Sequence, residues 1–260
     1  MQLKEITDYL DSYAPLYLQE DYDNAGLIVG DESMEIKKAL ICLDSTEAVI
    51  DEAIENNCQL VIAHHPIVFS GLKKITGETY IERVIIKAIK HNIAIYAAHT
   101  NMDNVLKGVN KKIAEQLDLK NCKILSPTSD IQIGAGLIGT LKKPMDEVTF
   151  LHNLKKSMQT DCIRHTQLLN KKISTIALCG GSGSFLLDVA IAKKADIFIT
   201  GDFKYHQFFD AEQKIVIADI GHYESEQYTI MLFYEILTKK FPNFAVLLTK
   251  INTNPINYLI

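Results

Sequence analysis

The stretch ALICLDSTEAVIDEAIENNCQLVIAHH, residues 39–65, decides the fold class. An apolar run at 39–43 is followed by a helical pattern at 46–57 and by a second apolar run at 60–63. A buried strand, a helix and another buried strand form the repeating unit of parallel α/β sheets. The stretch therefore predicts an α/β protein.

The same alternation continues along the chain. The other apolar runs, which we expect to form buried strands, are 93–98, 173–179, 196–200, 215–218 and 244–248. The other helical patterns are 3–14, 79–91, 184–194 and 224–240.

A weak internal repeat predicts two similar lobes. Cys42 precedes His64 by 22 residues, and Cys179 precedes Gly201 by 22 residues, in both cases across a strand, a helix and a second strand. The similarity lies in pattern more than in identity, but it indicates a duplicated α/β unit.

The boundary between the lobes is predicted at SPTSD, residues 126–130, because this segment is rich in turn-forming residues. We therefore expect a first lobe at 1–125 and a second at 126–260. The two are expected to pack as one unit, with no inserted domain.

Composition disfavours several classes of function. The net charge is −5 and the 27 lysine and arginine residues are spread along the chain, so no general nucleic-acid binding is expected. No apolar run approaches the roughly 18 residues of a membrane-spanning helix. The five cysteines form no C-x-x-C pair, which disfavours disulfides and a thiolate zinc site. A cytoplasmic protein that binds no membrane fits best.

Polar side chains collect directly after the predicted strands, where ligands of α/β folds gather. Five of the eight histidines lie there. The polar residues at these positions include Asp44, His64, His65, His99, Asp103, Asp202, His206, Asp219, His222 and Glu226. If the strands are parallel neighbours, these side chains converge on one sheet edge, as a mixed nitrogen and oxygen metal site requires.

The tandem His64-His65 follows the run at 60–63. Adjacent side chains of a regular strand point to opposite faces, so both can serve one site only where the strand ends. Pro66 predicts that end, because proline removes a ladder donor and restricts the residue before it. The alternative is two turn histidines bonded to backbone or water.

His222 and Glu226 are four residues apart, so they share a face if both lie in the predicted helix. Glu226 also falls on the apolar stripe of Ile230, Phe233 and Leu237, and a buried carboxylate needs a cation or several donors. The alternative is a salt bridge or an exposed helix end. If His222 begins the helix, the spacing alone does not fix a shared face.

Asp103 lies four residues beyond His99, where a turn or helix-capping role is the usual alternative. Together with the two pairs above it makes three histidines and two carboxylates, a set that suits Zn, Mn, Fe or Ni. Five protein ligands are too many for one catalytic tetrahedral ion with an open position. Two ions fit better.

The segment GGSGS at 180–184 follows a strand and opens a predicted helix. Its backbone N–H groups could surround a phosphate. No GK[ST] follows and no G-x-G-x-x-G is complete, so a tight strand-to-helix turn is the preferred interpretation. Gly26 and Gly30 are likewise interpreted as turn residues.

Six motifs occur in an order found in one known family. They are DNAGLIVG at 23–30, AHHPIVF at 63–69, AAHTNMD at 97–103, CGGSGS at 179–184, TGDFKYH at 200–206 and DIGHYESE at 219–226. With them, and with NTNPINYL at 252–259, the chain resembles the dinuclear-metal-centre hexamer family. Its members are YbgI-type or Nif-three-like proteins, often called GTP cyclohydrolase I type 2 homologues. The resemblance covers nearly the whole chain.

The resemblance implies two similar α/β lobes with the metal site between them at strand carboxyl ends, in a hexameric toroid. It implies two divalent ions per chain, of Zn, Fe, Mn or Ni, with Glu226 as a bridge. The implied ligands are His64, His65, Asp103, His222 and Glu226. Many family members carry an inserted domain between the lobes, and this chain has only a few residues, around 126–134, at that place.

The first functional hypothesis is a metal-dependent hydrolase, in which two ions lower the pKa of a water molecule and polarise the bond under attack. His99, Asp202 and His206 would then orient ligands or carry protons. The family label implies a small-molecule substrate, with water attack at C8 of a purine nucleotide. The alternative is a non-catalytic metal-binding or metal-delivery protein whose homohexamer serves as a scaffold.

Overall fold

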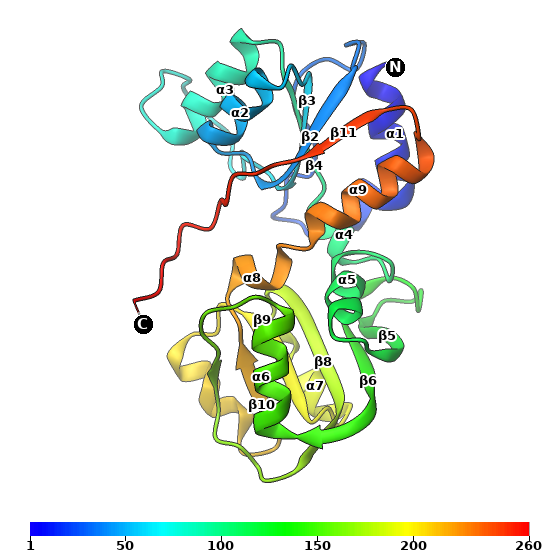
Figure 1. Ribbon diagram of the computed structural model, residues 1–260, viewed down its shortest axis with the longest axis vertical. Helices are drawn as coiled ribbons and strands as arrows, with labels where there is room; N and C mark the ends of the chain where they lie inside the picture. Colours follow the sequence, from blue (N-terminus) through cyan, green and yellow to red (C-terminus); the bar gives the residue numbers. More distant parts are fainter. Residues whose placement is uncertain (260) are drawn as a thin grey trace. The chain divides into compact units, whose positions relative to one another are not determined.

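The structure, a computed structural model, describes residues 1–259 and divides the chain into two compact units (Figure 1). Unit 1 contains Met1–Met102 and Thr229–Pro255. Unit 2 contains Asp103–Tyr228 and the residues from Ile256. Within the described residues, no helix has the length and apolar character that a membrane span requires.

Unit 1 is a five-stranded sheet with helices on both faces. The strand order is β1-β4-β3-β2-β11, in which β1 is antiparallel and the other four are parallel. The strands are β1 (Gly26–Val29), β2 (Lys38–Asp44), β3 (Leu60–His65), β4 (Ala94–Ala97) and β11 (Ala245–Leu248). The helices are α1 (Leu3–Tyr13), η1 (Leu16–Leu18), α2 (Glu47–Glu55), α3 (Tyr80–Lys90) and α9 (Thr229–Lys240). Figure 1 shows α2 and α3 over one face and α1 and α9 over the other.

β2, β3 and β4 are buried on both faces, which explains why they are continuously apolar in sequence. β11, at the edge of the sheet, is only partly buried, so the strand expected at 244–248 is present but is not a buried one. The face under α2 and α3 carries one hydrophobic core. Both helices begin at a threonine whose hydroxyl accepts a backbone N–H of the first turn, Thr46 from Val49 and Thr79 from Glu82, each at 3.3 Å. These caps satisfy donors that a helix start otherwise leaves without a partner.

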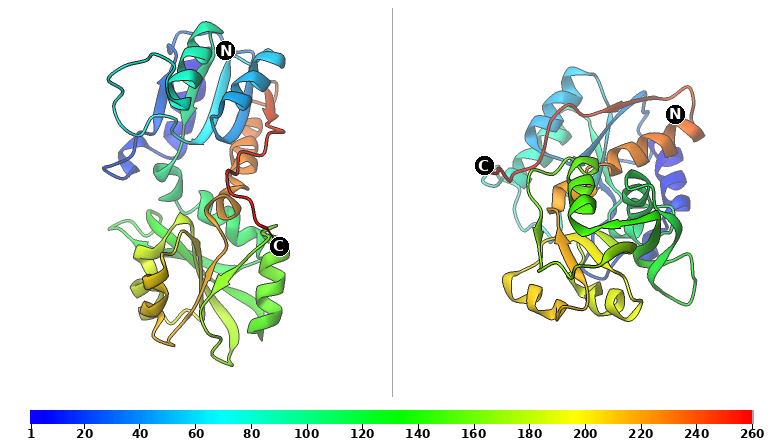
Figure 2. Two further views of the ribbon diagram at one scale, coloured as in Figure 1. Left: turned by 90° about the vertical axis from the view of Figure 1, so that its left-hand side faces the viewer. Right: turned by 60° about the horizontal axis from the view of Figure 1, so that its bottom comes forward.

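Unit 2 is a six-stranded mixed sheet of order β5-β6-β8-β9-β10-β7, in which β8, β9 and β10 are parallel. The strands are β5 (Lys120–Pro127), β6 (Gly134–Asp146), β7 (Arg164–His165), β8 (Lys172–Ser182), β9 (Ile197–Gly201) and β10 (Val216–Asp219). The helices are α4 (Thr100–Asp103), which spans the change of unit, α5 (Val109–Gln116), α6 (Glu147–Ser157), η2 (Ser184–Leu186), α7 (Leu187–Ala192), η3 (Tyr205–Ala211) and α8 (His222–Glu226). Figure 2 shows α6 on one face of the sheet and the short helices η2, α7 and η3 on the other.

The structure confirms the α/β class, and each predicted strand is present. The two members of the internal repeat have the same order, β2-α2-β3 and β8-α7-β9, and in both the two strands are parallel neighbours. The predicted repeat therefore corresponds to a repeated βαβ unit, one in each half of the protein.

The division of the chain differs from the predicted boundary at 126–130. That segment covers the end of β5 and the start of its connection to β6, inside unit 2. The chain instead changes unit at Met102, and β11 returns to unit 1 to pair with β2, Leu247 opposite Leu40. Turn composition cannot reveal this return, because tertiary pairing selects the partner of a strand.

The single helix predicted at 224–240 is wrong. The chain forms α8 and α9 with a break between them, and it changes unit at Thr229. Glu226 therefore does not share a helical stripe with Phe233 and Leu237, which are buried in unit 1. Gly26, predicted in a turn, begins β1.

Candidate metal centre

Unit 1 gathers three histidines at the carboxyl ends of β3 and β4. His64 and His65 end β3 just before Pro66, as predicted, and His99 lies two residues after β4. One ligand nitrogen from each ring lies within 4.8 Å of the others. The ring centroids are 4.9 Å apart for His64 and His65, and 5.2 and 5.4 Å from that of His99. These residues are called the histidine cluster below.

Each ring of the histidine cluster is oriented through Nδ1. The Nδ1 contacts are His64 to the carbonyl oxygen of Ala98 (2.9 Å), His65 to Oδ1 of Asp44 (2.7 Å) and His99 to Oδ1 of Asp23 (2.8 Å). A carbonyl or carboxylate oxygen only accepts, so Nδ1 carries the proton and Nε2 carries the lone pair. Metal-binding histidines usually have this arrangement, which holds the ring in a fixed orientation.

Asp23 links the DNAGLIVG segment to the histidine cluster. Besides its bond to His99, its carboxylate accepts the backbone N–H (3.0 Å) and the hydroxyl of Thr100. Burial opposes ionisation of this carboxyl, but the hydrogen bonds from His99 and Thr100 lower its pKa to about 2. The spacing of residues along the chain gives no signal for Asp23, although it falls in one of the six family motifs.

Asp44 orients His65 in the same way from the end of β2. Burial raises the pKa of Asp44, but the hydrogen bond from His65 outweighs burial and lowers it. The hydroxyl of Thr253 donates to the second oxygen at 2.6 Å. The signal for Asp44 was present in the sequence, since it directly follows the apolar run at 39–43, but only the structure identifies its partner.

Unit 2 places Glu226 within reach of both Asp103 and His222. Oε2 of Glu226 lies 3.1 Å from Nε2 of His222, so the pair shares a face even though His222 begins α8. A carboxylate oxygen of Asp103 lies within 4.8 Å of one of Glu226, which is 2% exposed. Two carboxylates this close repel each other strongly when buried, unless a cation accompanies them. The donor set therefore fits a divalent ion.

The glycines of GGSGS make room for Glu226. Gly181 lies in β8 at φ 61, and a Cβ there would collide with Oε1 of Glu226 and lie 3.2 Å from Cε1 of His222. The backbone N–H of Gly181 also donates to the hydroxyl of Ser225 at 2.9 Å. The first three residues of the segment belong to the strand, so the predicted strand-to-helix turn describes only its second half. A phosphate-binding role remains a prediction.

In the absence of a metal ion, His222 holds a proton. Burial lowers its pKa, but the charges of Glu226 and Asp202 outweigh burial and raise it to about 11. Nδ1 lies 2.7 Å from Oδ2 of Asp202, and this bond from His222 lowers the pKa of Asp202. Asp202 thus accepts a hydrogen bond from the ring of His222, and its role in orienting a metal ligand stays a prediction. A divalent ion would replace the proton at Nε2.

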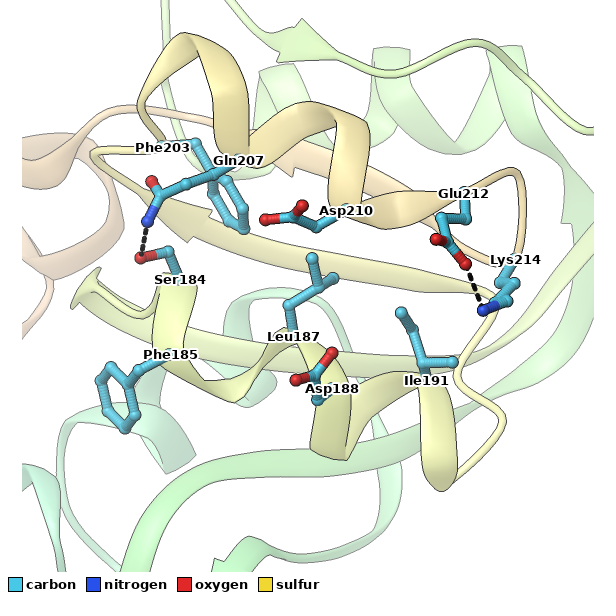
Figure 3. A pocket seen from close by; sticks show the side chains of 10 residues that line it. All are labelled: Ser184, Phe185, Leu187, Asp188, Ile191, Phe203, Gln207, Asp210, Glu212 and Lys214. Atoms are coloured by element: carbon cyan, nitrogen blue, oxygen red, sulfur yellow. Dashed lines mark hydrogen bonds and ion pairs between the residues drawn. The ribbon is translucent and has the colours of Figure 1, made fainter.

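His206, also predicted to orient ligands or carry protons, lies in an exposed aromatic group on η3. Its ring centroid is 5.1 Å from that of Tyr205 and 6.4 Å from that of Phe209. A pocket of about 400 Å³ in unit 2 opens beside η3 (Figure 3). Its lining combines apolar residues such as Leu187 with exposed acids such as Asp188, and it includes none of the predicted metal ligands.

Fold and side-chain chemistry together define an α/β protein with histidine and carboxylate groups that suit metal ions. The chain belongs to the Duf34/NIF3 (NGG1p interacting factor 3) family, whose model matches residues 1–255. This confirms the resemblance drawn from the six motifs.

Known relatives are similar along nearly the full length. A protein of Clostridium acetobutylicum named GTP cyclohydrolase 1 type 2 homolog is 33% identical, covering 99% of this chain and 99% of the relative. A protein of Clostridium perfringens with the same name is 38% identical, covering 87% of each. The solved structure of a Bacillus cereus protein related to NIF3 matches with a TM-score of 0.92 at 25% identity, covering 100% of this chain and 99% of that one.

Proposed function

We propose that the protein is a dinuclear metal-dependent hydrolase. The proposed ligands of the two divalent ions are His64, His65, Asp103, His222 and Glu226. The names of the relatives point to a nucleotide as the substrate class. We further propose a cytoplasmic homohexamer, as the family resemblance implies.

The observation that carries this proposal is the common orientation of four imidazoles. His64, His65, His99 and His222 each direct Nδ1 at an oxygen that only accepts. For three of them that oxygen belongs to a carboxylate, which raises the basicity of Nε2 toward a metal. A histidine that only packs in a core needs one satisfied nitrogen, whereas three rings grouped in unit 1, and a fourth beside Glu226 in unit 2, all oriented through Nδ1, suit metal binding.

Divalent ions at such a site supply Lewis acidity, which lowers the pKa of water and polarises the bond under attack. The residues of the chain have separate tasks. Asp44 and Asp202 hold the rings of His65 and His222 in orientation. The hydrogen-bonded pair of His99 and Asp23 suits proton transfer at Nε2 of His99, since the carboxylate stabilises the imidazolium that forms.

Hydrolysis is tested with protein loaded with Zn²⁺, Mn²⁺, Fe²⁺ or Ni²⁺ and supplied with GTP or an aryl phosphate. We expect metal-dependent release of formate from GTP, which follows opening of the imidazole ring, or of phosphate from the ester. The activity should disappear with a chelator and in His64→Ala. His152→Ala should retain it, because His152 is an exposed residue of α6 bonded to the carbonyl oxygen of Val148.

If metal-loaded protein hydrolyses neither class of substrate, the hydrolase is rejected. A metal-binding or metal-delivery scaffold then becomes the better description.

A further inference from the structure

Asp219, the last residue of β10, is a buried carboxylate that the proposed metal site does not use. It is 2% exposed and accepts two backbone hydrogen bonds. Oδ2 accepts the N–H of Phe203 at 2.9 Å, and Oδ1 accepts the N–H of Gly221 at 3.0 Å. A charge this deeply buried is stable only with such donors and a counter-ion.

The two backbone N–H groups that donate to Asp219 belong to residues next in sequence to Asp202 and His222. Phe203 directly follows Asp202, and Gly221 directly precedes His222. The backbone at both places is unusual, since φ is 58° at Asp202 and 94° at Gly221. A backbone with positive φ of this kind persists when the surrounding hydrogen bonds fix it. The carboxylate of Asp219 therefore anchors both the segment that carries Asp202 and the segment that carries His222. The side chains of these two residues meet at 2.7 Å.

Arg164, in β7, completes the anchor. Its guanidinium forms an ion pair with Asp219, donates to the carbonyl oxygen of Phe203 at 3.1 Å, and lies 5.6 Å from the ring centroid of Phe208. Both polar groups of the Phe203 backbone are thereby held, the N–H by Asp219 and the C=O by Arg164. The neighbouring Asp202 has little freedom to move away from His222.

We propose that Asp219, supported by Arg164, is a positioning residue for the metal ligand His222. It holds Asp202 against Nδ1 of the ring, so that Nε2 and Glu226 present a fixed geometry to the ion. The inference rests on the proposed metal site, and it assigns to Asp219 an effect on affinity that is separate from its contribution to folding.

The variant Asp219→Asn tests this role, because it replaces one accepting oxygen with an NH₂ group and keeps the shape of the side chain. One of the two backbone N–H groups loses its acceptor. Loss of an outer partner of a metal ligand typically weakens binding roughly ten- to hundred-fold. We expect that loss for one Zn²⁺ ion per chain, measured by competition with a chromogenic chelator well below the unfolding temperature.

Asp196→Asn is the matched control. Oδ2 of Asp196 also accepts two backbone N–H groups, from Ser174 and Thr175, at 2.8 Å each, but Asp196 precedes β9 at the opposite end of the strand from Asp202. Its loss should lower thermal stability and leave Zn²⁺ affinity unchanged. Arg164→Lys, which keeps the charge, should show a smaller loss of affinity than Asp219→Asn.

A double-mutant cycle with Asp202→Asn decides whether Asp219 acts through Asp202. If it does, the double variant binds Zn²⁺ no more weakly than Asp202→Asn alone. If the fold-losses of Zn²⁺ affinity in the two single variants multiply in the double variant, the inference is overturned. It is also overturned if wild-type protein binds metal and Asp219→Asn binds it with the same affinity. A wild-type protein that binds no metal would overturn the proposed site together with this role.

Discussion

The histidine cluster of unit 1 differs in its electrostatics from the set formed by Asp103, His222 and Glu226 in unit 2. Unit 1 presents three imidazole rings, each oriented through Nδ1 by an oxygen that only accepts. Unit 2 brings Asp103 close to Glu226 and balances them with a protonated His222. The first group is organised without a metal, whereas the second concentrates negative charge. The largest electrostatic gain from a divalent ion is therefore expected in unit 2.

The largest effect should come from metal itself. A ligand that binds only the folded state at about 1,000 times its Kd stabilises a protein by about 4 kcal/mol. We expect Zn²⁺ or Mn²⁺ to raise the unfolding temperature, measured by calorimetry, and a chelator to reverse the shift. In Glu226→Gln most of this metal-dependent rise in unfolding temperature should be absent, because the substitution removes the buried charge. An equal increase in this variant would mean that the ion binds elsewhere.

The second effect concerns the space beside Glu226. Gly181→Ala places a methyl group against Oε1 of Glu226 in a left-handed backbone conformation that costs a non-glycine residue roughly 1–2 kcal/mol by itself. We expect lower stability in denaturant unfolding and weaker metal binding. Gly71→Ala in unit 1 is the control, since a Cβ there meets nothing within 4 Å. If Gly181→Ala binds metal like wild type, Glu226 is not held as described.

The smallest expected effect is on the pH dependence of stability, which should differ between the two regions in protein treated with a chelator. The raised pKa of His222 contributes stability that is complete below about 6.5 and is lost as pH rises through about 11. The lowered pKa of Asp23 contributes stability that is present above about 3.8 and is lost as pH falls through about 2.

The unfolding temperature should therefore fall less steeply with rising alkaline pH in His222→Gln than in wild type. In Asp23→Asn it should fall less steeply as the pH is lowered into the acid range. Unchanged profiles in both variants would remove the electrostatic difference between the two regions.

Much of the fold could be predicted because buried parallel strands are continuously apolar, as in 60–63 and 215–218. The unit boundary could not, because β11 lies near the end of the chain and pairs with β2, about two hundred residues earlier. The break between α8 and α9 was missed for a related reason. The residues after Glu226 keep a helical pattern, but the chain leaves one unit for the other there.

The candidate ligands could be predicted because histidines and acids directly follow strands. Their supporting residues were harder to find. Asp23 meets His99 across 76 residues, and Asp202 meets His222 across 20. Gly181 is informative only once Glu226 is seen beside it. Contacts of this kind depend on tertiary structure, so spacing along the chain signals them weakly.

The most direct test of the metal centre is elemental analysis of protein purified without added metal. Wild-type protein is predicted to hold close to two divalent ions per chain, and the double variant His64→Ala, Glu226→Ala is predicted to hold almost none. His91→Ala and His152→Ala, which change exposed histidines of units 1 and 2, should match wild type. A wild-type chain without metal, and with none taken up from Zn²⁺, Mn²⁺, Fe²⁺ or Ni²⁺, would contradict the proposed site.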